Sequence, residues 1–368
     1  MTSLPEFLKE LFESWPLLGI LPVWFYSIVA IFGLLFLFLF PFAGVAVYVE
    51  RKIAGDIQAR IGPNVVGPYG ILQWIADALK LLLKEDIIPT NADKKLFILS
   101  PMLIFISGAC AYAVIPFADN VILANLNIGI FYLLAITSMV TLGLILGGWA
   151  SNNKWSLLGG LRAAAQVVSY EIPVALSILT VVLVTGTLDM AQIVKMQGPF
   201  YWNIFHNPFL FISACIYYIA ALAEANRTPF DIPEADSELV SGYNTEYSGM
   251  RFAIFFLIEY AECFIICAVA TTLFLGGWHL PFFDLSSLTL GLRIPLQIMV
   301  FMTKSILLLL TMMWIRWTLP RYRVDQLMKL CWEVFVPFSF ACLIGTAFWM
   351  VLFKGKGIPE LILGLFVS

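Results

Sequence analysis

Apolar runs dominate this chain, and short polar segments separate them. Eight runs are long enough, or nearly so, to cross a hydrocarbon core about 30 Å thick. They cover residues 22–49, 97–117, 130–150, 167–186, 209–223, 252–277, 295–314 and 334–353. The first run is unusually long and contains Pro41, so we expect it to tilt, kink or project beyond the bilayer. The pattern predicts an all-α integral membrane protein with about eight transmembrane helices.

No polar segment is long enough to form a separate soluble domain, so we expect a single membrane domain. Its parts are an amphipathic entry segment at residues 1–21, a helical bundle at 22–353 and a C-terminal tail at 354–368. The entry segment contains acidic residues and has no basic stretch before a short apolar core. It therefore does not resemble a cleaved signal peptide.

The basic residues divide the connecting segments into two groups. The four at 50–96, 151–166, 224–251 and 315–333 contain seven, two, two and four Lys or Arg, which is fifteen of the twenty-one in the chain. Cytoplasmic loops of membrane proteins are enriched in these residues. We therefore expect these charged loops on the cytoplasmic side and both termini outside, as an even number of spans requires. We expect a bacterial cell inner membrane rather than an organelle inner membrane.

The composition excludes several classes of protein and of site. Hydrophobic residues make up 61% and charged residues 12%, too few charges to cover the surface of a soluble domain. No two of the six cysteines have Cys-x-x-Cys spacing, and the two histidines are far apart, so we expect no iron–sulfur cluster and no metal site. No phosphate-binding glycine motif and no nucleophile–base pair are present. We expect no nucleotide or nucleic-acid ligand.

One segment of the first charged loop predicts a surface helix. Gln73, Asp77, Lys80 and Lys84 recur at helical spacing, and apolar residues occupy the opposite face. Such a helix suits the membrane surface or a groove against other spans.

Three acidic residues fall inside or at the edge of apolar spans. Glu171 opens the fourth, and Glu259 and Glu262 lie one helical turn apart within the sixth. A lone carboxylate in hydrocarbon costs several kcal/mol, about 3 or more by insertion scales, so each must face protein, water or a partner. For Glu171 the alternative is a structural role, either in a buried ion pair, given Arg162 upstream, or as a helix cap. For the other two, proximity of like charges favours a proton path over a structural role.

The loop at 224–251 is rich in acidic residues, although it is one of the loops expected on the cytoplasmic side, where basic residues usually predominate. Its six acids are Glu224, Asp231, Glu234, Asp236, Glu238 and Glu246, against two arginines, Arg227 and Arg251. Prolines, aromatic residues and Leu-Val punctuate the loop, unlike an ordinary solvated segment. We interpret it as a folded, partly buried acidic cluster.

Several of these segments together are similar to one known family. They are Glu-Arg-Lys at 50–52, Arg-Ile-Gly-Pro-Asn-Val-Val-Gly-Pro-Tyr-Gly at 60–70, the charged helix at 76–85, Gly-Gly-Leu-Arg at 159–162, Ser-Tyr-Glu-Ile-Pro at 169–173, the acidic loop, and 314–326. Over residues 22–353 the chain resembles the subunit 1 family of respiratory complex I.

The resemblance implies a membrane subunit of a proton-translocating NADH:quinone oxidoreductase, with no redox cofactor and no independent activity of its own. Quinone is the implied substrate, and FMN and Fe–S clusters belong to partner subunits. The implied partners are the peripheral quinone-site and Fe–S subunits, the neighbouring membrane-arm subunits and the lipid bilayer.

The resemblance also implies two sets of functional residues. The implied quinone tunnel and chamber comprise Glu50, Arg51, Arg60, Asp77, Glu224, Arg227, Asp231, Glu234, Asp236, Glu238, Glu246, Arg316, Arg321 and Arg323. The implied proton path comprises Glu171 and Glu259, to which we add Glu262 because it lies one turn further along. We hypothesise that quinone reduction changes the charge or the proton occupancy of the chamber, and that the acids relay this change through Glu171 and Glu259.

Two alternative functions stay open at this point. One is a stand-alone ion transporter that uses Glu259 and Glu262 as its ion site, although no internal repeat supports it. The other is the equivalent membrane subunit of a membrane-bound hydrogenase-type complex, which the complete acidic loop disfavours.

Overall fold

The computed structural model describes residues 3–6, 9, 22–198, 201–281, 283 and 289–360. Across these residues the chain is helical and forms no strand beyond two isolated bridges. The main helices are α2 (Val23–Gly33), α3 (Phe40–Ile57), α4 (Gln73–Leu83), α5 (Lys94–Ala111), α6 (Gly129–Ala150), α7 (Lys154–Thr185), α8 (Met190–Met196), α9 (Pro208–Glu224), α10 (Asp236–Leu239), α11 (Gly249–Leu273), α12 (Leu290–Thr318), α13 (Val324–Lys329) and α14 (Val336–Leu352). The predicted all-α membrane fold is confirmed. Most of residues 1–21 and residues 361–368 lie outside the described part of the chain.

Within the described residues, seven helical stretches are long and apolar enough to cross a membrane, and the 17-residue α9 is a shorter apolar helix. All eight correspond to the predicted runs. The chief difference is α7, which begins at Lys154 rather than at residue 167. Its first turns contain Lys154 and Arg162, so hydropathy alone places the start of this helix too late.

Two long helices contain a π-helical segment just before a proline. Leu34–Leu39 joins α2 to α3 ahead of Pro41, and Leu330–Phe335 joins α13 to α14 ahead of Pro337. Proline has no N–H to donate, and its ring crowds the preceding turn. The turn there is wider, with i→i−5 hydrogen bonds such as Phe40 N–H to Leu35 O. The expected distortion near Pro41 is therefore a π segment within one continuous helix.

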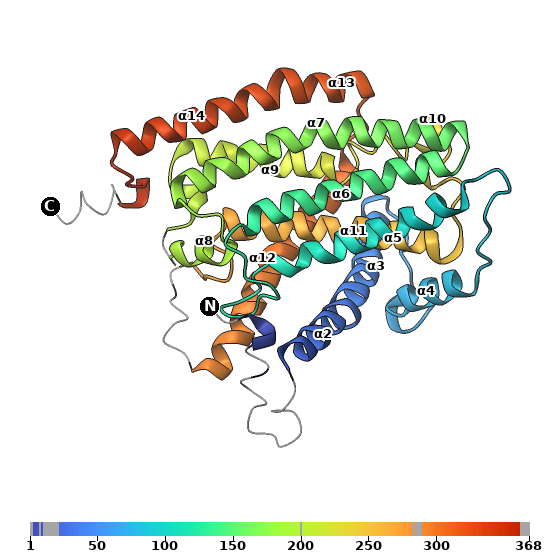
Figure 1. The fold of residues 1–368 in the computed structure, drawn as a ribbon, viewed down its shortest axis with the longest axis horizontal. Coiled ribbons are helices and arrows are strands. Elements are labelled where there is room, and N and C mark those ends of the chain that lie inside the picture. Colours follow the sequence, from blue (N-terminus) through green and yellow to red (C-terminus); the bar gives the residue numbers. More distant parts are fainter. Residues whose placement is uncertain are drawn as a thin grey trace.

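Helices α5, α6, α7, α9 and α11 run side by side through the body of the molecule, and α2, α3 and α12 cross it at an angle (Figure 1). The pair α5–α6 packs closely, because a Cβ on Gly143 would come 2.2 Å from Ile104 Cγ1. Helix α4 lies against α3 and α11, and α10 lies near the same end of the molecule (Figure 1). This end also contains the acidic loop.

Candidate functional site

A buried ionic network lies where α3, α11, α12 and the acidic loop meet. Arg227 is 5% exposed; its Nη1 is 3.3 Å from Glu50 Oε2, and its Nε is 3.0 Å from Glu259 Oε1. Arg316 pairs with the other oxygen of Glu50, and Tyr260 donates its hydroxyl to Glu50 at 2.7 Å. Two carboxylates are thus held by two guanidiniums, and burial of either charge alone would be costly.

The wall of this network is apolar on one side. The Arg227 guanidinium stacks over the Tyr260 ring, with its carbon 4.1 Å from the ring centroid. Cys263, Met312 and Met313 complete a small cavity of about 10 Å³ beside the charged groups. Its volume is close to the minimum that one water molecule needs.

A much larger cavity, about 370 Å³, lies between α3, α4 and α11. Its lining is mainly apolar and aromatic, with three charged side chains: Phe40, Ala43, Gly44, Val47, Arg51, Trp74, Asp77, Ala78, Lys80, Leu81, Phe252, Ala253, Phe256, Leu257 and Tyr260. Arg51 pairs with Asp77 at 2.6 Å, and Lys80 lies 3.6 Å from the same carboxylate. Tyr260 lines both cavities, so one side chain separates the apolar space from the ionic network.

The acidic loop is folded, as predicted. Gln166 of α7 donates from Nε2 to Ala223 O and to Phe230 O, both at 2.7 Å, and so fixes the loop on either side of Arg227. Tyr322 N–H donates to Pro229 O at 3.0 Å and joins the loop to the segment after α12.

Two carboxyls of this loop, Asp231 and Glu234, hold protons unusually tightly. Burial raises the pKa of Asp231 to about 6, although Arg321 lies 2.9 Å away. Burial, together with the charges of Glu259 and Asp231, raises the pKa of Glu234 to about 8, and Asn244 donates to this group at 2.6 Å. The loop therefore contains groups that change protonation near neutral pH.

The remaining polar residues predicted for the chamber lie outside the ionic network. Arg162 of α7 binds Glu238 at 2.5 Å, and Asn153 donates to Glu246 at 2.6 Å. The prediction that Arg162 could neutralise Glu171 is therefore wrong. Arg60 and Arg323 are exposed and form no ion pair with any described residue. The side chain of Asp236 lies outside the described part of the structure.

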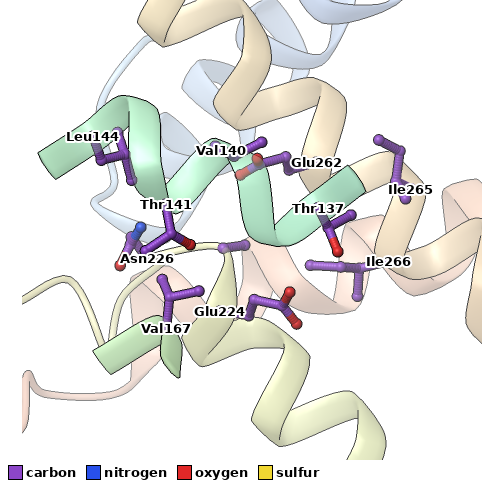
Figure 2. Close-up of a pocket in the computed structure, with 11 residues that line it drawn as sticks. Thr137, Val140, Thr141, Leu144, Val167, Glu224, Asn226, Glu262, Ile265 and Ile266 are labelled. Carbon is purple, nitrogen blue, oxygen red and sulfur yellow. The ribbon is translucent and has the colours of Figure 1, made fainter. Parts of the chain in front are cut away.

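Inside the membrane body, Glu224 and Glu262 line one cavity of about 30 Å³ between α6, α7, α9 and α11. Figure 2 shows the two carboxyl groups approaching from opposite sides, with Thr137 and Thr141 on α6 and Asn226 beside them. Among the described residues, no Lys or Arg lines this cavity, and none forms a hydrogen bond with the buried Oδ1 of Asn226. A water-sized space bordered by these groups is suited to hold an ordered water.

The structure groups two of the predicted residues differently from the quinone-chamber and proton-path sets that the resemblance implies. Glu259 belongs with Arg227 and Glu50, whereas Glu224 joins Glu262 in the membrane cavity. Glu171 on α7 is half-buried and forms no ion pair with the described residues. The prediction missed Tyr260 and Asn226, which have no distinctive sequence signal. Thr137 and Thr141, two hydroxyls at i, i+4 in an apolar span, could have been found.

Metal chemistry has no visible site in the described part of the chain. Within those ranges, no three His, Cys, Asp or Glu side chains gather in a way that could hold a metal ion.

Comparison with known proteins gives a consistent result. A family model described as NADH dehydrogenase matches residues 29–347. Several bacterial relatives carry the name of one and the same subunit of NADH-quinone oxidoreductase. That of Anaeromyxobacter dehalogenans is 44% identical, covering 92% of this chain and 86% of the relative. Those of Chlorobium luteolum and Rickettsia bellii are 49% and 52% identical, each covering 83% of this chain, and 84% and 86% of the relative. The buried ionic network and the acidic loop therefore belong to a member of the NADH dehydrogenase family of multi-pass membrane proteins, whose relatives are named as subunits of a quinone-linked oxidoreductase.

Proposed function

We propose that this chain is the membrane subunit of a multi-subunit NADH-quinone oxidoreductase in a bacterial inner membrane. In this proposal it lines the path by which quinone reaches its reduction site and couples that reaction to proton translocation. The names of its bacterial relatives support the assembly, and the seven long apolar helices in the described part of the chain support a membrane location. Partner subunits would supply FMN, Fe–S clusters and the rest of the quinone site.

The observation that carries the quinone path is the junction at Tyr260. A quinone has a long hydrocarbon tail and a head with two carbonyl oxygens. The 370 Å³ cavity offers apolar and aromatic walls to the tail, as ligand pockets commonly do. At Tyr260 the surroundings change to the Glu50–Arg227–Arg316 network, whose donors suit carbonyl oxygens. Arg51 and Asp77 would form the polar rim of the path.

Reduction of a quinone to a quinol takes up two electrons and two protons. In the proposal the electrons come from partner subunits, and the acidic loop participates in the proton balance, because Asp231 and Glu234 exchange protons near neutral pH. Exposed Arg60 and Arg323 lie in the charged loops, where a peripheral subunit would complete the chamber.

Helix α11 offers the route for coupling. Glu259 binds Arg227 on the quinone side, and Glu262, one turn later, lines the membrane cavity with Glu224. A change in the charge on Arg227's partners would change the field at Glu262 across a single helical turn. Glu171 would continue the acidic path through α7. This arrangement disfavours a stand-alone transporter with Glu259 and Glu262 as a shared ion site, because Glu259 is already neutralised.

The quinone path is tested by filling its cavity. In the purified complex, Ala253→Phe adds a ring to the wall of the 370 Å³ space, and Ala341→Phe adds the same ring to the exposed face of α14. We expect Ala253→Phe to raise KM severalfold for long-tailed quinones and much less for short-tailed ones. The control should leave both values unchanged. Equal KM values in the two variants would contradict a quinone path through this cavity.

A further inference from the structure

A second apolar cavity lies at the opposite end of the bundle from α4 and α10. It measures about 350 Å³, opens to the surface and is bordered by residues 3–6, α2, the π segment that follows α2, the connection between α5 and α6, and α12. Helices α2 and α12 both lie low in the view of Figure 1. Apart from Gly33, every described residue that lines it has an apolar side chain: Leu4, Val29, Ala30, Leu34, Phe38, Phe117, Val121, Leu123 and Ile298.

A cluster with excess positive charge adjoins this cavity. Asp119, in the α5–α6 connection, forms an ion pair with Lys195 of α8 at 2.7 Å and another with Arg293 of α12 at 2.8 Å. These two cations face one carboxylate, so the cluster formed by the described residues carries a net charge of about +1. The Nε of Arg293 is buried and has no hydrogen-bond partner in the described part of the chain. A buried guanidinium donor without an acceptor is costly and leaves the positive charge of Arg293 only partly compensated.

The charged cluster and the cavity share their walls. Phe117 and Val121, which line the cavity, flank Asp119 in sequence and are joined by a 3.1 Å hydrogen bond from Phe117 N–H to Val121 O. On the other side, Asp119 N–H donates at 3.2 Å to Gln297 Oε1, and Gln297 precedes the cavity residue Ile298. A molecule with an anionic end and a hydrocarbon end could therefore contact both at once.

We infer that this cavity binds a phospholipid with a net negative head group. The phosphate contacts Arg293 and Lys195, which are 27% and 39% exposed, and one acyl chain fills the apolar cavity. The surplus cation favours an anionic over a zwitterionic head group, because a head group without net charge would leave that cation uncompensated. Inorganic phosphate would leave the apolar cavity unused. The site is separate from the proposed quinone path, so its binding does not depend on that function.

The test counts tightly bound phospholipids in the detergent-purified complex by native mass spectrometry and lipid extraction. Arg293→Gln and Lys195→Gln remove the head-group contacts, and Lys354→Gln is the matched control among the exposed cations. Gly33→Leu fills the cavity: a Cβ there meets no atom of the described chain within 4 Å, and Gly33 has helical φ and ψ of −58° and −47°. Ala341→Leu adds bulk on exposed α14 as its control.

We expect each of the three site variants to lose one anionic phospholipid, while both controls keep it. Lys195→Gln keeps the test decisive if Arg293→Gln assembles poorly, because Lys195 is the more exposed of the two cations. An unchanged lipid count in all variants overturns the inference. So does loss in the two cation variants without loss in Gly33→Leu, because the acyl chain of the bound lipid would then lie outside this cavity. Displacement of the bound molecule by excess inorganic phosphate alone would identify a phosphate site instead.

Discussion

Replacing Glu234 with glutamine isolates the electrostatic consequence of burying a carboxyl in the acidic loop. Gln has nearly the same shape and can still accept the hydrogen bond that Asn244 donates at 2.6 Å, but it never ionises. Any pH dependence that comes from this side chain should therefore vanish in Glu234→Gln, while the packing of the loop stays the same.

The size and the sign of the pH effect on stability follow from the pKa of Glu234. Folding raises the pKa of Glu234 from 4.5 to about 8, which corresponds to about 5 kcal/mol in favour of the protonated form. Between these two values the folded loop keeps a proton that the unfolded chain has lost. The stability of the loop is therefore highest below pH 4.5 and falls by about 1.4 kcal/mol per pH unit until pH passes about 8. Between pH 6 and pH 8 the loss from this group is about 2 kcal/mol.

The assay is thermal inactivation of the purified complex at pH 6 and at pH 8. Glu234→Gln should be more heat-resistant than the wild type. The difference between their midpoint temperatures of inactivation should be larger at pH 8 than at pH 6, by about a few degrees. Glu238→Gln is the control, because this carboxylate of the same loop is 51% exposed and pairs with Arg162 at the surface. An advantage of equal size at both pH values, or one that shrinks as pH rises, would refute the reasoning.

Three further substitutions probe the rest of the site. Arg227→Met leaves Glu259 without its cation and should lower the stability of the assembled complex by about 3–5 kcal/mol, seen as early heat inactivation, with partial recovery in Arg227→Lys; wild-type stability in the Met variant would contradict a buried ion pair. Tyr260→Phe removes a 2.7 Å hydrogen bond to Glu50, worth about 1.5–3 kcal/mol, and should raise KM for quinone while assembly stays normal; an unchanged KM would separate Tyr260 from quinone binding. Glu262→Gln should lower the number of protons translocated per NADH more than the rate of NADH oxidation, measured in sealed vesicles, whereas Glu333→Gln should lower neither; an intact ratio in Glu262→Gln would remove this residue from the proton path.

Hydropathy was sufficient to predict the eight helices but not where each begins. Apolar side chains identify the part of a helix that meets lipid, and α7 continues from there into a charged first half that packs on protein. The folded acidic loop was also predictable, since prolines and aromatic residues among acids are unusual in a solvated segment.

The grouping of the acids was not predictable from spacing. Glu259 and Glu262 are one turn apart, which predicts a shared face, yet one binds Arg227 and the other faces Glu224. What separates them is the path of the chain after α9, which places Glu224 and Arg227 at different heights along α11. Contacts between residues far apart in sequence fix this path. Gln166, for example, donates hydrogen bonds to Ala223 O and Phe230 O.

Asn226 and Arg227 are consecutive, but the Asn226 side chain lines the membrane cavity and the Arg227 side chain enters the ionic network. Asn226 has a left-handed φ of 52°, a conformation that asparagine tolerates better than most residues and that turns the chain sharply at the end of α9. Rotation of the peptide between Asn226 and Arg227 would move both side chains together. The membrane cavity and the ionic network could then influence each other without a continuous chain of water molecules, because the backbone at these two residues connects them.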